Sequence, residues 1–397
     1  MQLRVDRRLE MDTKIFKHFT TVEFGVGAAE TIGDKVKEFG GTKALLVTDP
    51  GLISTGMIDT IEKYLQDAQI PVVRFADIKG NPVVGCIEQG VKVMKDNGCD
   101  ITIAIGGGSS MDVAKAINIV EANGGNILDY EVTREGQKNP LKKRKKPLIA
   151  IPTTSGTGSE VTIWSVLTDP ARNMKASFGH PWYAPDLALA DPVLTASVPA
   201  GLTAATGMDA LTHAIEAYTS IAPMPQTDAL ALHAIELISQ NLRQAVANGK
   251  NIPAREGMLM GSLMAGMAFN SSPVGCVHAM AHTLGGAYDT PHGVANAIML
   301  PYVMEYNITA CPERFADVAV AMGEVGDGLS VIEVADKSIA AVKRMSSDVG
   351  IPRLREVGCK KEDIPKLAEL AFNDMNHNGN PKPMTVDKMI EIYNEAY

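Results

Sequence analysis

Two short segments of the sequence carry most of the side chains that could bind a metal ion. Asp209 and His213 are four residues apart in a segment of helical periodicity, so both side chains leave the same face of a helix. His278 and His282 repeat this spacing, and His292 follows them. Carboxylate and imidazole ligands without a thiolate favour a divalent transition metal such as Fe(II) or Zn(II). The spacing predicts a metal site and leaves open which of these five side chains bind the ion.

A glycine-rich turn is typical of a phosphate-binding site. Residues 106–109 (GGGS) follow the apolar run 101–105 and open an amphipathic segment. Glycines let the backbone approach a ligand closely, and a helix N-terminus offers free N–H groups and the positive end of the helix dipole. The turn therefore predicts a site for the pyrophosphate of a dinucleotide.

An acidic residue after a neighbouring strand favours NAD over NADP. Asp49 follows the apolar run 44–48, and the turn 25–27 (GVG) precedes it in the chain. A carboxylate there would hold the ribose hydroxyls and repel a 2′-phosphate. The glycine fingerprint is incomplete, because Glu30 stands where a third glycine would be expected. The alternative is that residues 49–51 (DPG) only form a turn.

A hydroxyl-rich loop adds further donors. Residues 152–160 (PTTSGTGSE) follow the apolar run 148–151. Their small hydroxyls and glycines could surround a polar ligand, and the alternative is a loop that only caps a helix.

Alternating strands and helices are expected to position these groups. Four short, nearly continuous apolar runs predict strands covered on both faces, at 44–48, 72–75, 101–105 and 148–151. Apolar residues at spacings of three and four predict helices between them, at 28–39, 57–68, 85–97 and 111–122. This order is typical of a parallel sheet with right-handed crossovers.

The second half of the chain has a different composition. From about Pro199, alanine, methionine and leucine dominate, and strand-like runs flanked by turns are lacking. We therefore predict an α/β plus all-α fold. A Rossmann-like, dinucleotide-binding domain would span residues 1–195, and an all-helical domain for metal and substrate would span residues 196–397.

Composition excludes several classes of function. The net charge of −9 argues against binding to nucleic acid. The sequence has no run of eighteen apolar residues and no signal-peptide core, so we expect neither a membrane span nor secretion by that route. Five cysteines without a CxxC pair fit a reducing cytoplasm.

A nucleotide site together with a metal site predicts hydride transfer. An alcohol bound to the metal through its oxygen would lose a hydride to nicotinamide, and the reverse reaction would polarise an aldehyde carbonyl. Patterns for acyl transfer, P-loop ATP hydrolysis and zincin proteolysis are missing from the sequence.

From about Phe19 to Tyr397, the sequence resembles the iron-containing (group III) alcohol dehydrogenases. Within that family it most resembles the 1,3-propanediol dehydrogenases, the methanol or ethanol dehydrogenases, and the lactaldehyde reductases. The segments that carry the resemblance are GGGSSMDVAK at 106–115, PTTSGTGSEVT at 152–162, GMDALTHAIEAY at 207–218, AGMAFN at 265–270 and GCVHAMAHTLGGAYDTPHGVANAIMLP at 275–301.

The resemblance implies a role for each candidate residue. Asp209, His213, His278 and His292 would be the metal ligands, and His282 would lie beside the nicotinamide. The positions implied for NAD(H) are Asp49, Asn81, Gly107, Gly108, Ser109, Asp112, Thr153, Thr154, Thr157, Val166, Lys175, Leu202 and His282. The resemblance also implies a dehydroquinate synthase-like architecture with an interdomain cleft, and a homo-oligomer that is a dimer or larger.

The expected reaction interconverts a short primary alcohol or diol and its aldehyde, with NAD(H) and Fe(II) as cofactors. Trp164, Phe269, Asn376 and His377 are expected to shape the substrate pocket. Alternatives are a Zn(II)-dependent enzyme of the glycerol dehydrogenase kind, or a reductase of a functionalised aldehyde such as lactaldehyde, sulfoacetaldehyde or a semialdehyde. A lyase-type cyclisation and a non-catalytic metal-binding protein are more distant alternatives.

Overall fold

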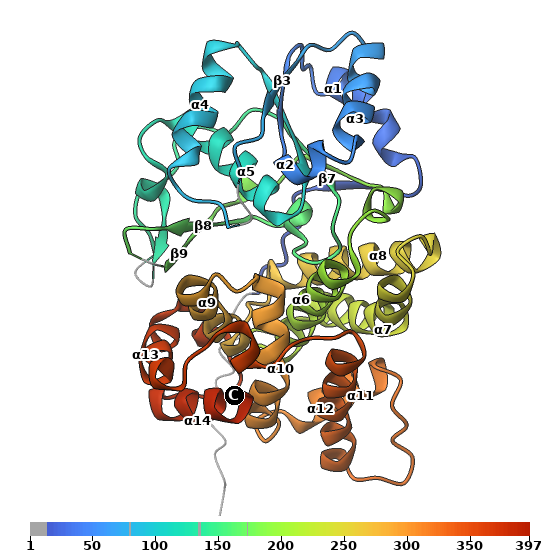
Figure 1. The fold of residues 1–397 in the computed structure, drawn as a ribbon, viewed down its shortest axis with the longest axis vertical. Helices are drawn as coiled ribbons and strands as arrows, with labels where there is room; N and C mark the ends of the chain where they lie inside the picture. The colour runs from blue at the N-terminus through green and yellow to red at the C-terminus, as the bar shows by residue number, and fades with distance from the viewer. Residues whose placement is uncertain (1–13, 79–80, 134–135, 173) are drawn as a thin grey trace, which may run out of the picture.

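A six-stranded parallel sheet forms the centre of the first half of the chain. The computed structural model describes residues 14–78, 81–133, 136–172 and 174–397 (Figure 1). The strand order is β1-β10-β7-β4-β2-β3, and every neighbouring pair is parallel. The strands are β1 (Thr21–Phe24), β2 (Ala44–Val47), β3 (Val72–Phe75), β4 (Ile101–Gly106), β7 (Leu148–Pro152) and β10 (Leu187–Ala190). The predicted parallel sheet is confirmed.

Helices cover both faces of this sheet. Because side chains alternate along a strand, Ala44 and Leu46 belong to one buried cluster and Leu45 and Val47 to another. The first cluster includes residues of α1 (Ile32–Glu38) and α3 (Met57–Asp67), and the second includes residues of α4 (Cys86–Asp96) and α5 (Gly108–Asn123). Burial on both faces explains why β2, β4 and β7 are continuously apolar.

Six strands were not predicted from the sequence, two of them in the main sheet and four in two antiparallel pairs. Strand β10 has the sequence LALA, which lacks β-branched residues, and β1 is a partly exposed edge strand. The antiparallel pairs β5 (Val132–Thr133) with β6 (Gly136–Gln137), and β8 (Trp164–Asp169) with β9 (Met174–Gly179), lie outside the main sheet.

The glycine turn 25–27 does not form a dinucleotide fingerprint with Asp49. It follows β1, which is separated from β2 by three strands. The backbone N–H of Gly27 instead donates to Oδ2 of Asp191 (2.9 Å). That part of the sequence interpretation was wrong, because it assumed that the turn lies beside the end of β2, whereas β10, β7 and β4 lie between β1 and β2.

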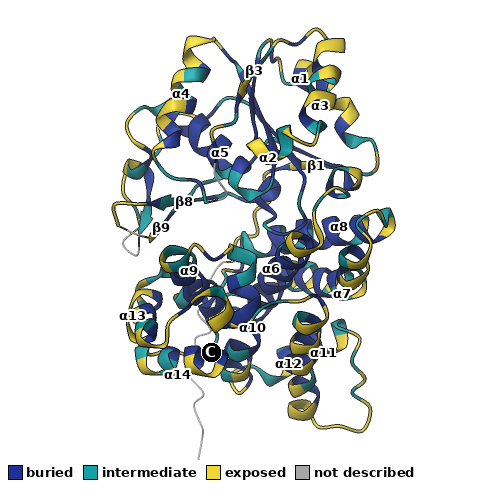
Figure 2. Ribbon diagram, in the orientation of Figure 1, coloured by how far each residue is buried: buried dark blue, intermediate teal, exposed yellow. Residues whose placement is uncertain are grey.

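The second half is helical, as predicted. Residues 196–397 are all described and contain no strand. The helices are α6 (Ala200–Thr219), α7 (Pro225–Ala247), α8 (Ile252–Phe269), α9 (Cys276–Tyr288), α10 (His292–Asn307), α11 (Pro312–Ala321), α12 (Val331–Asp348), α13 (Ile364–Asn373) and α14 (Val386–Ala396). Helix α6 is buried along most of its length between the other helices and the sheet-containing half (Figure 2). The domain division at residue 195 stays a prediction.

Short helical segments complete the fold. Helix α2 (Pro50–Ile53) follows Asp49, and the 3-10 segments are Ala28–Thr31, Ile127–Tyr130, Ser159–Val161, Pro181–Tyr183, Pro192–Thr195, Leu354–Val357, Lys361–Asp363 and Met375–Gly379. No helix in the described part of the chain is long and apolar enough to cross a membrane.

The hydroxyl-rich loop 152–160 packs against the helical half of the chain. Gly158 lies against Gly266 of α8, where a Cβ on Gly158 would stand 2.7 Å from the Cα of Gly266. The side chain of Asn270 donates to the carbonyl of Val161 (2.7 Å) and accepts from the N–H of Ile163 (3.0 Å). The loop therefore lies directly on the helical half of the molecule.

Candidate metal and nucleotide site

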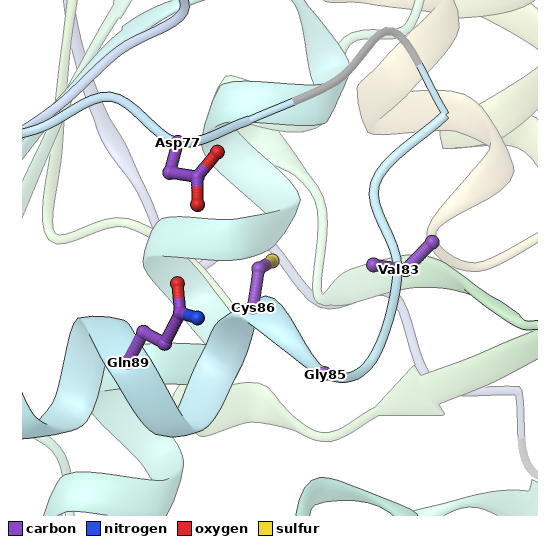
Figure 3. Close-up of a pocket in the computed structure, with 5 residues that line it drawn as sticks. All are labelled: Asp77, Val83, Gly85, Cys86 and Gln89. Atoms are coloured by element: carbon purple, nitrogen blue, oxygen red, sulfur yellow. The ribbon is translucent and has the colours of Figure 1, made fainter.

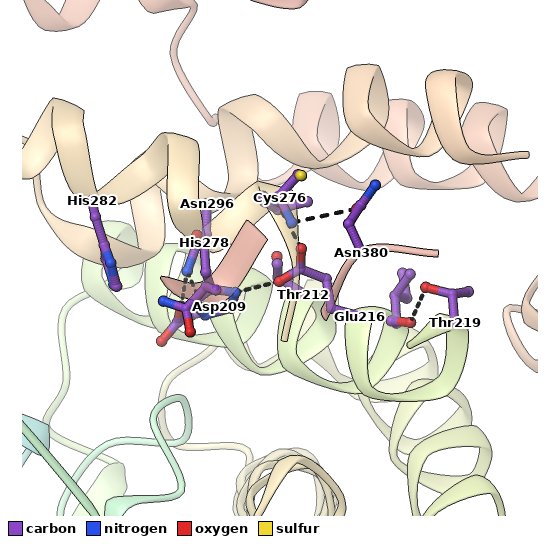
Figure 4. A network of polar contacts seen from close by, with 12 residues as sticks. Asp209, Thr212, Glu216, Thr219, Cys276, His278, His282, Asn296 and Asn380 are labelled. Atoms are coloured by element: carbon purple, nitrogen blue, oxygen red, sulfur yellow. Dashed lines mark hydrogen bonds and ion pairs between the residues drawn. The ribbon is translucent and has the colours of Figure 1, made fainter. Parts of the chain in front are cut away.

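Four of the five predicted metal-binding side chains meet at one point. Helix α6 presents Asp209 and His213, α9 presents His278, and His292 begins α10. One potential ligand atom from each of these residues lies within 4.8 Å of those of the others. Asp209 and His278 are buried and the His292 side chain is 34% exposed, so the cluster opens toward His292. Figure 4 shows His278 and Asn296 grouped around Asp209.

The hydrogen bonding of this cluster fits a cation. The amide nitrogen of Asn296 donates to Oδ1 of Asp209 (2.7 Å), and it lies 3.2 Å from Nε2 of His278 and 3.1 Å from Nε2 of His292. An amide has two N–H groups for these three acceptors. Nδ1 of His213 is also buried, without a hydrogen-bond partner among the described residues. The cluster therefore has more hydrogen-bond acceptors than hydrogen-bond donors. Such an excess of lone pairs is expected where the side chains bind a divalent cation.

The protonation states also suit a metal. Burial lowers the pKa of His278 well below its ordinary value, and the neighbouring His213 adds to the effect. Partial burial likewise lowers the pKa of His292. Burial alone would raise the pKa of Asp209, but the nearby imidazoles outweigh it and hold that pKa below its usual range. Neutral imidazole and ionised carboxylate are the forms that bind divalent cations.

His282 lies beside the cluster rather than in it. Its ring centroid is 5.4 Å from that of His292 and 6.2 Å from that of His278. Its Nδ1 is 2.7 Å from Oδ2 of Asp374. A hydrogen bond from Nδ1–H to this carboxylate leaves Nε2 of His282 with a lone pair.

The predicted nucleotide residues gather at the carboxyl ends of β2, β4 and β7. Asp49 follows β2, and its Oδ2 accepts from Ser110 Oγ at 3.4 Å. The turn 106–109 follows β4 and packs against the loop after β7, since a Cβ on Gly107 would stand 3.3 Å from Oγ1 of Thr154. A Cβ on Gly108 would stand only 2.7 Å from a methyl carbon of Thr157, so a larger residue would push the loop away. Thr153 joins this group through its N–H, which donates to Gly106 (3.0 Å).

Asp112 connects the same helix to the β8 region. One carboxylate oxygen accepts from Ser159 Oγ (2.8 Å), and the other accepts from the N–H of Val166 (2.9 Å). Both oxygens are thus engaged by the protein. This geometry fits a residue that orders the loop, and direct contact of Asp112 or Val166 with a cofactor stays a prediction.

Four other predicted cofactor residues lie on β9, on the segment before α4, and in the first turns of α5 and α6. Lys175 Nζ donates to Oδ1 of Asn81 (3.0 Å), and Nδ2 of Asn81 donates to Asp289, which ends α9. Burial lowers the pKa of Lys175. Leu202, in the first turn of α6, is 46% exposed, and Ser109 lies in the first turn of α5.

The four residues predicted to shape the substrate pocket are placed differently. Phe269 stacks on His213 with 4.6 Å between ring centroids. Asn376 donates its N–H to Oδ1 of Asp374 (2.8 Å), and Nδ1 of His377 lies 2.8 Å from the carbonyl oxygen of Asp374. Trp164 begins β8, and its ring covers Gly179. Phe269 therefore contacts the Asp-His cluster directly, whereas Asn376 and His377 contact Asp374, the partner of His282.

Sequence analysis missed three polar residues of the site. Glu216 is three residues after His213 on α6, and Asn296 is four residues after His292 on α10, so helical spacing was the available signal. Asp374 is 92 residues from His282, and no local pattern in the chain connects them.

A separate hollow lies at the start of α4 (Figure 3). Its lining residues are Asp77, Val83, Gly85, Cys86 and Gln89. Burial raises the pKa of the Cys86 thiol to about 11, which makes it a poor nucleophile. None of the predicted site residues lines this hollow.

Comparison with known proteins agrees with the class of enzyme that this fold and site suggest. Residues 20–192 match the family described as iron-containing alcohol dehydrogenase. Residues 203–397 match the C-terminal part of the Fe-containing alcohol dehydrogenase family. The chain belongs to the iron-containing alcohol dehydrogenase family, whose members are oxidoreductases that act on alcohols and aldehydes.

Individual relatives are similar over nearly the whole chain. The 1,3-propanediol dehydrogenase of Citrobacter freundii is 47% identical over 377 residues, which cover 94% of this chain and 96% of the relative. The NAD-dependent methanol dehydrogenase of Bacillus methanolicus is 43% identical over 373 residues, covering 94% and 97%. A crystal structure of a 1,3-propanediol oxidoreductase superposes with a TM-score of 0.94 at 44% identity, covering 97% of this chain and 100% of that one.

Proposed function

We propose that this protein is an NAD-dependent, Fe(II)-dependent dehydrogenase that interconverts a short primary alcohol or diol and its aldehyde. The cluster of Asp209, His213, His278 and His292, with ligand atoms within 4.8 Å of one another, carries the proposal. When bound, Fe(II) supplies a Lewis acid for the substrate oxygen, and NAD(H) supplies the hydride acceptor or donor. Zn(II) is the alternative metal, because this donor set suits both ions.

The residues around the cluster would orient the substrate and move its proton. Oxidation of an alcohol to an aldehyde releases one hydride and one proton. With Nδ1–H donated to Asp374, Nε2 of His282 is available to accept that proton or pass it to water. The stacked ring of Phe269 excludes water from one side of His213. We propose that Trp164, Asn376 and His377 form the more distant edge of the pocket.

The nucleotide would extend along the carboxyl edge of the sheet. Backbone N–H groups at the start of α5 suit a pyrophosphate, and Asp49 suits the ribose hydroxyls. The remaining contacts that we propose come from Asn81, Gly107, Gly108, Ser109, Asp112, Thr153, Thr154, Thr157, Val166, Lys175, Leu202 and His282. The name of the NAD-dependent methanol dehydrogenase supports NAD as the cofactor.

The names of the relatives support the proposed substrate class. Their names specify 1,3-propanediol and methanol, which are both short primary alcohols. A reductase of a functionalised aldehyde is the alternative, since Asn376 and His377 would bring polar groups toward the pocket. We also propose a cytoplasmic homo-oligomer, a dimer or larger.

An anaerobic screen tests the proposal. The metal-free protein is loaded with Fe(II), Zn(II) or no metal, and NAD(H) and NADP(H) turnover is followed with short alcohols, diols and aldehydes. We expect net NADH formation with a short primary alcohol after Fe(II) loading. No turnover with any alcohol or aldehyde under all three conditions would contradict the proposal.

A further inference from the structure

Glu216 connects two parts of the cluster that sequence analysis treated separately. It lies on α6, three residues after His213, and its side chain is buried. Oε2 contacts Nδ1 of His278 on α9, and Oε1 accepts from the backbone N–H of Val277 (2.7 Å). Figure 4 shows Glu216 on the same helix as Asp209, toward the start of α9.

The contact with His278 fixes which nitrogen of that ring can bind a ligand. The amide nitrogen of Asn296 is a donor within reach of Nε2, so Nε2 carries the lone pair, and Nδ1 then carries the proton that Oε2 of Glu216 accepts. Nε2 is the atom that faces the cluster, because it lies 3.2 Å from the amide nitrogen of Asn296. Carboxylates that hold metal-binding histidines in this way orient the ring and increase its basicity.

The contact with Val277 fixes the helix that carries both His278 and His282. The first N–H groups of a helix have no partner within the helix, and a negative charge at this end interacts favourably with the helix dipole. Space for the carboxylate is tight, since a Cβ on Gly275 would stand 3.1 Å from Oε1. On the other side, Oδ1 of Asn380 accepts from the N–H of Cys276 (3.4 Å).

We infer that Glu216 is a positioning residue of the metal site, which sets the tautomer of His278 and the start of α9 with one carboxylate. The inference rests on the proposed function, because it needs a cation at the cluster. A residue that only capped the helix would not contact His278. Asn380 accepts from the first turn of the same helix, and its other side-chain contacts go to Asn307 and to the carbonyl of Lys382, so it offers a control.

Metal affinity without substrate or nucleotide tests this inference. The metal-free wild type, Glu216→Gln and Asn380→Ala are titrated with Zn(II) against a chromophoric chelator, and with Fe(II) under anaerobic conditions. We expect Glu216→Gln to raise the dissociation constant by about 10- to 100-fold. We expect Asn380→Ala to lower the unfolding temperature and to leave the dissociation constant within about 2-fold of wild type, since it does not touch His278.

The outcomes separate this inference from the proposed function. If wild type binds neither metal at the cluster, both are wrong. If wild type binds metal and Glu216→Gln binds it equally tightly, or if Asn380→Ala weakens binding as much, only the role of Glu216 is wrong. Should Glu216→Gln fail to fold, Glu216→Asp withdraws the carboxylate by one methylene group, and the same weakening is expected.

Discussion

Nδ1 of His282 lies 2.7 Å from Oδ2 of Asp374, although 92 residues separate them in the chain. The other oxygen of Asp374 accepts the N–H of Asn376 (2.8 Å), so the carboxylate is held from both sides. Burial would raise the pKa of Asp374, but His282 and this N–H outweigh it and keep the carboxyl ionised. The pair fixes the ring of His282 in one orientation next to the Asp-His cluster.

Replacement of Asp374 should therefore impair proton transfer more than it impairs metal binding. We expect Asp374→Ala to lower kcat by about 100-fold, within the range for general acid–base groups, with metal content unchanged. Asp374→Asn keeps an acceptor for Nδ1–H and should restore part of the loss. Steady-state kinetics and metal analysis measure both effects.

The matched control is Asp363→Ala. Asp363 also accepts one hydrogen bond in the C-terminal region, from Tyr288 (2.6 Å), and does not contact His282. An equal fall in kcat for Asp363→Ala and Asp374→Ala would show that general destabilisation, and not the orientation of His282, is responsible.

Removal of a cluster imidazole should remove the metal. We expect His278→Ala to retain little bound metal after dialysis, because one ligand and the partner of Glu216 are lost together. His233→Ala is the control, since His233 is exposed on α7 and pairs with Glu236. Metal analysis of the dialysed proteins decides the question: stoichiometric metal in His278→Ala would rule out its role as a ligand.

The charge of Asp49 should decide the choice of nucleotide. Oδ1 of Asp49 also accepts the N–H of Leu52 (3.1 Å) and caps α2. Asp49→Asn removes the charge and keeps a good N-cap residue. We expect the ratio of kcat/KM for NAD to that for NADP to fall by roughly 10-fold or more, because a full charge no longer repels a 2′-phosphate. An unchanged ratio would count against the ribose role.

A buried lysine should hold the hydroxyl-rich loop in place. Nζ of Lys115 on α5 donates to Ser159 Oγ (2.7 Å), to the carbonyl of Trp164 (2.8 Å) and to the carbonyl of Thr162 (3.1 Å). Lys115→Met leaves these acceptors buried without a donor. We expect a loss of about 3 kcal/mol in the free energy of unfolding, together with a higher KM for NAD.

Lys63→Met is the matched substitution on the surface. Lys63 forms an exposed ion pair with Asp67 (2.5 Å), and pairs of this kind contribute less than about 1 kcal/mol. Chemical denaturation measures both variants. If Lys115→Met lowers the free energy of unfolding no more than Lys63→Met does, the Lys115 contacts do not stabilise the loop.

The sequence predicted best the elements that are buried on both faces. Strands β2, β4 and β7 are continuous apolar runs because helices cover both sides of the sheet. Strand β10 is equally buried, but its alternating leucine and alanine residues carry little strand propensity. Strand order was also beyond local patterns, which is why the turn 25–27 was wrongly joined to Asp49.

At the site, too, relationships within one helix could be predicted from the sequence, whereas contacts between distant segments could not. Asp209 and His213 could be paired from the sequence because both lie on one helix, four residues apart. Glu216 lies on the same helix, so its spacing from His213 could be read from the sequence. Its role could not, because both of its contacts are with residues of α9. Asp374 could not be found, because its contact with His282 depends on how α9 packs against the C-terminal segments.

The proposed function requires that the Asp-His-His-His cluster hold the metal for NAD-linked alcohol oxidation. The most direct test adds Fe(II) stepwise and anaerobically to metal-free protein while NADH formation from 1,3-propanediol or methanol is measured. We predict that activity rises with each addition and saturates at one Fe(II) per chain, and that His278→Ala shows no rise. Full NAD-linked activity in the metal-free protein, or an equal rise in His278→Ala, would contradict the account.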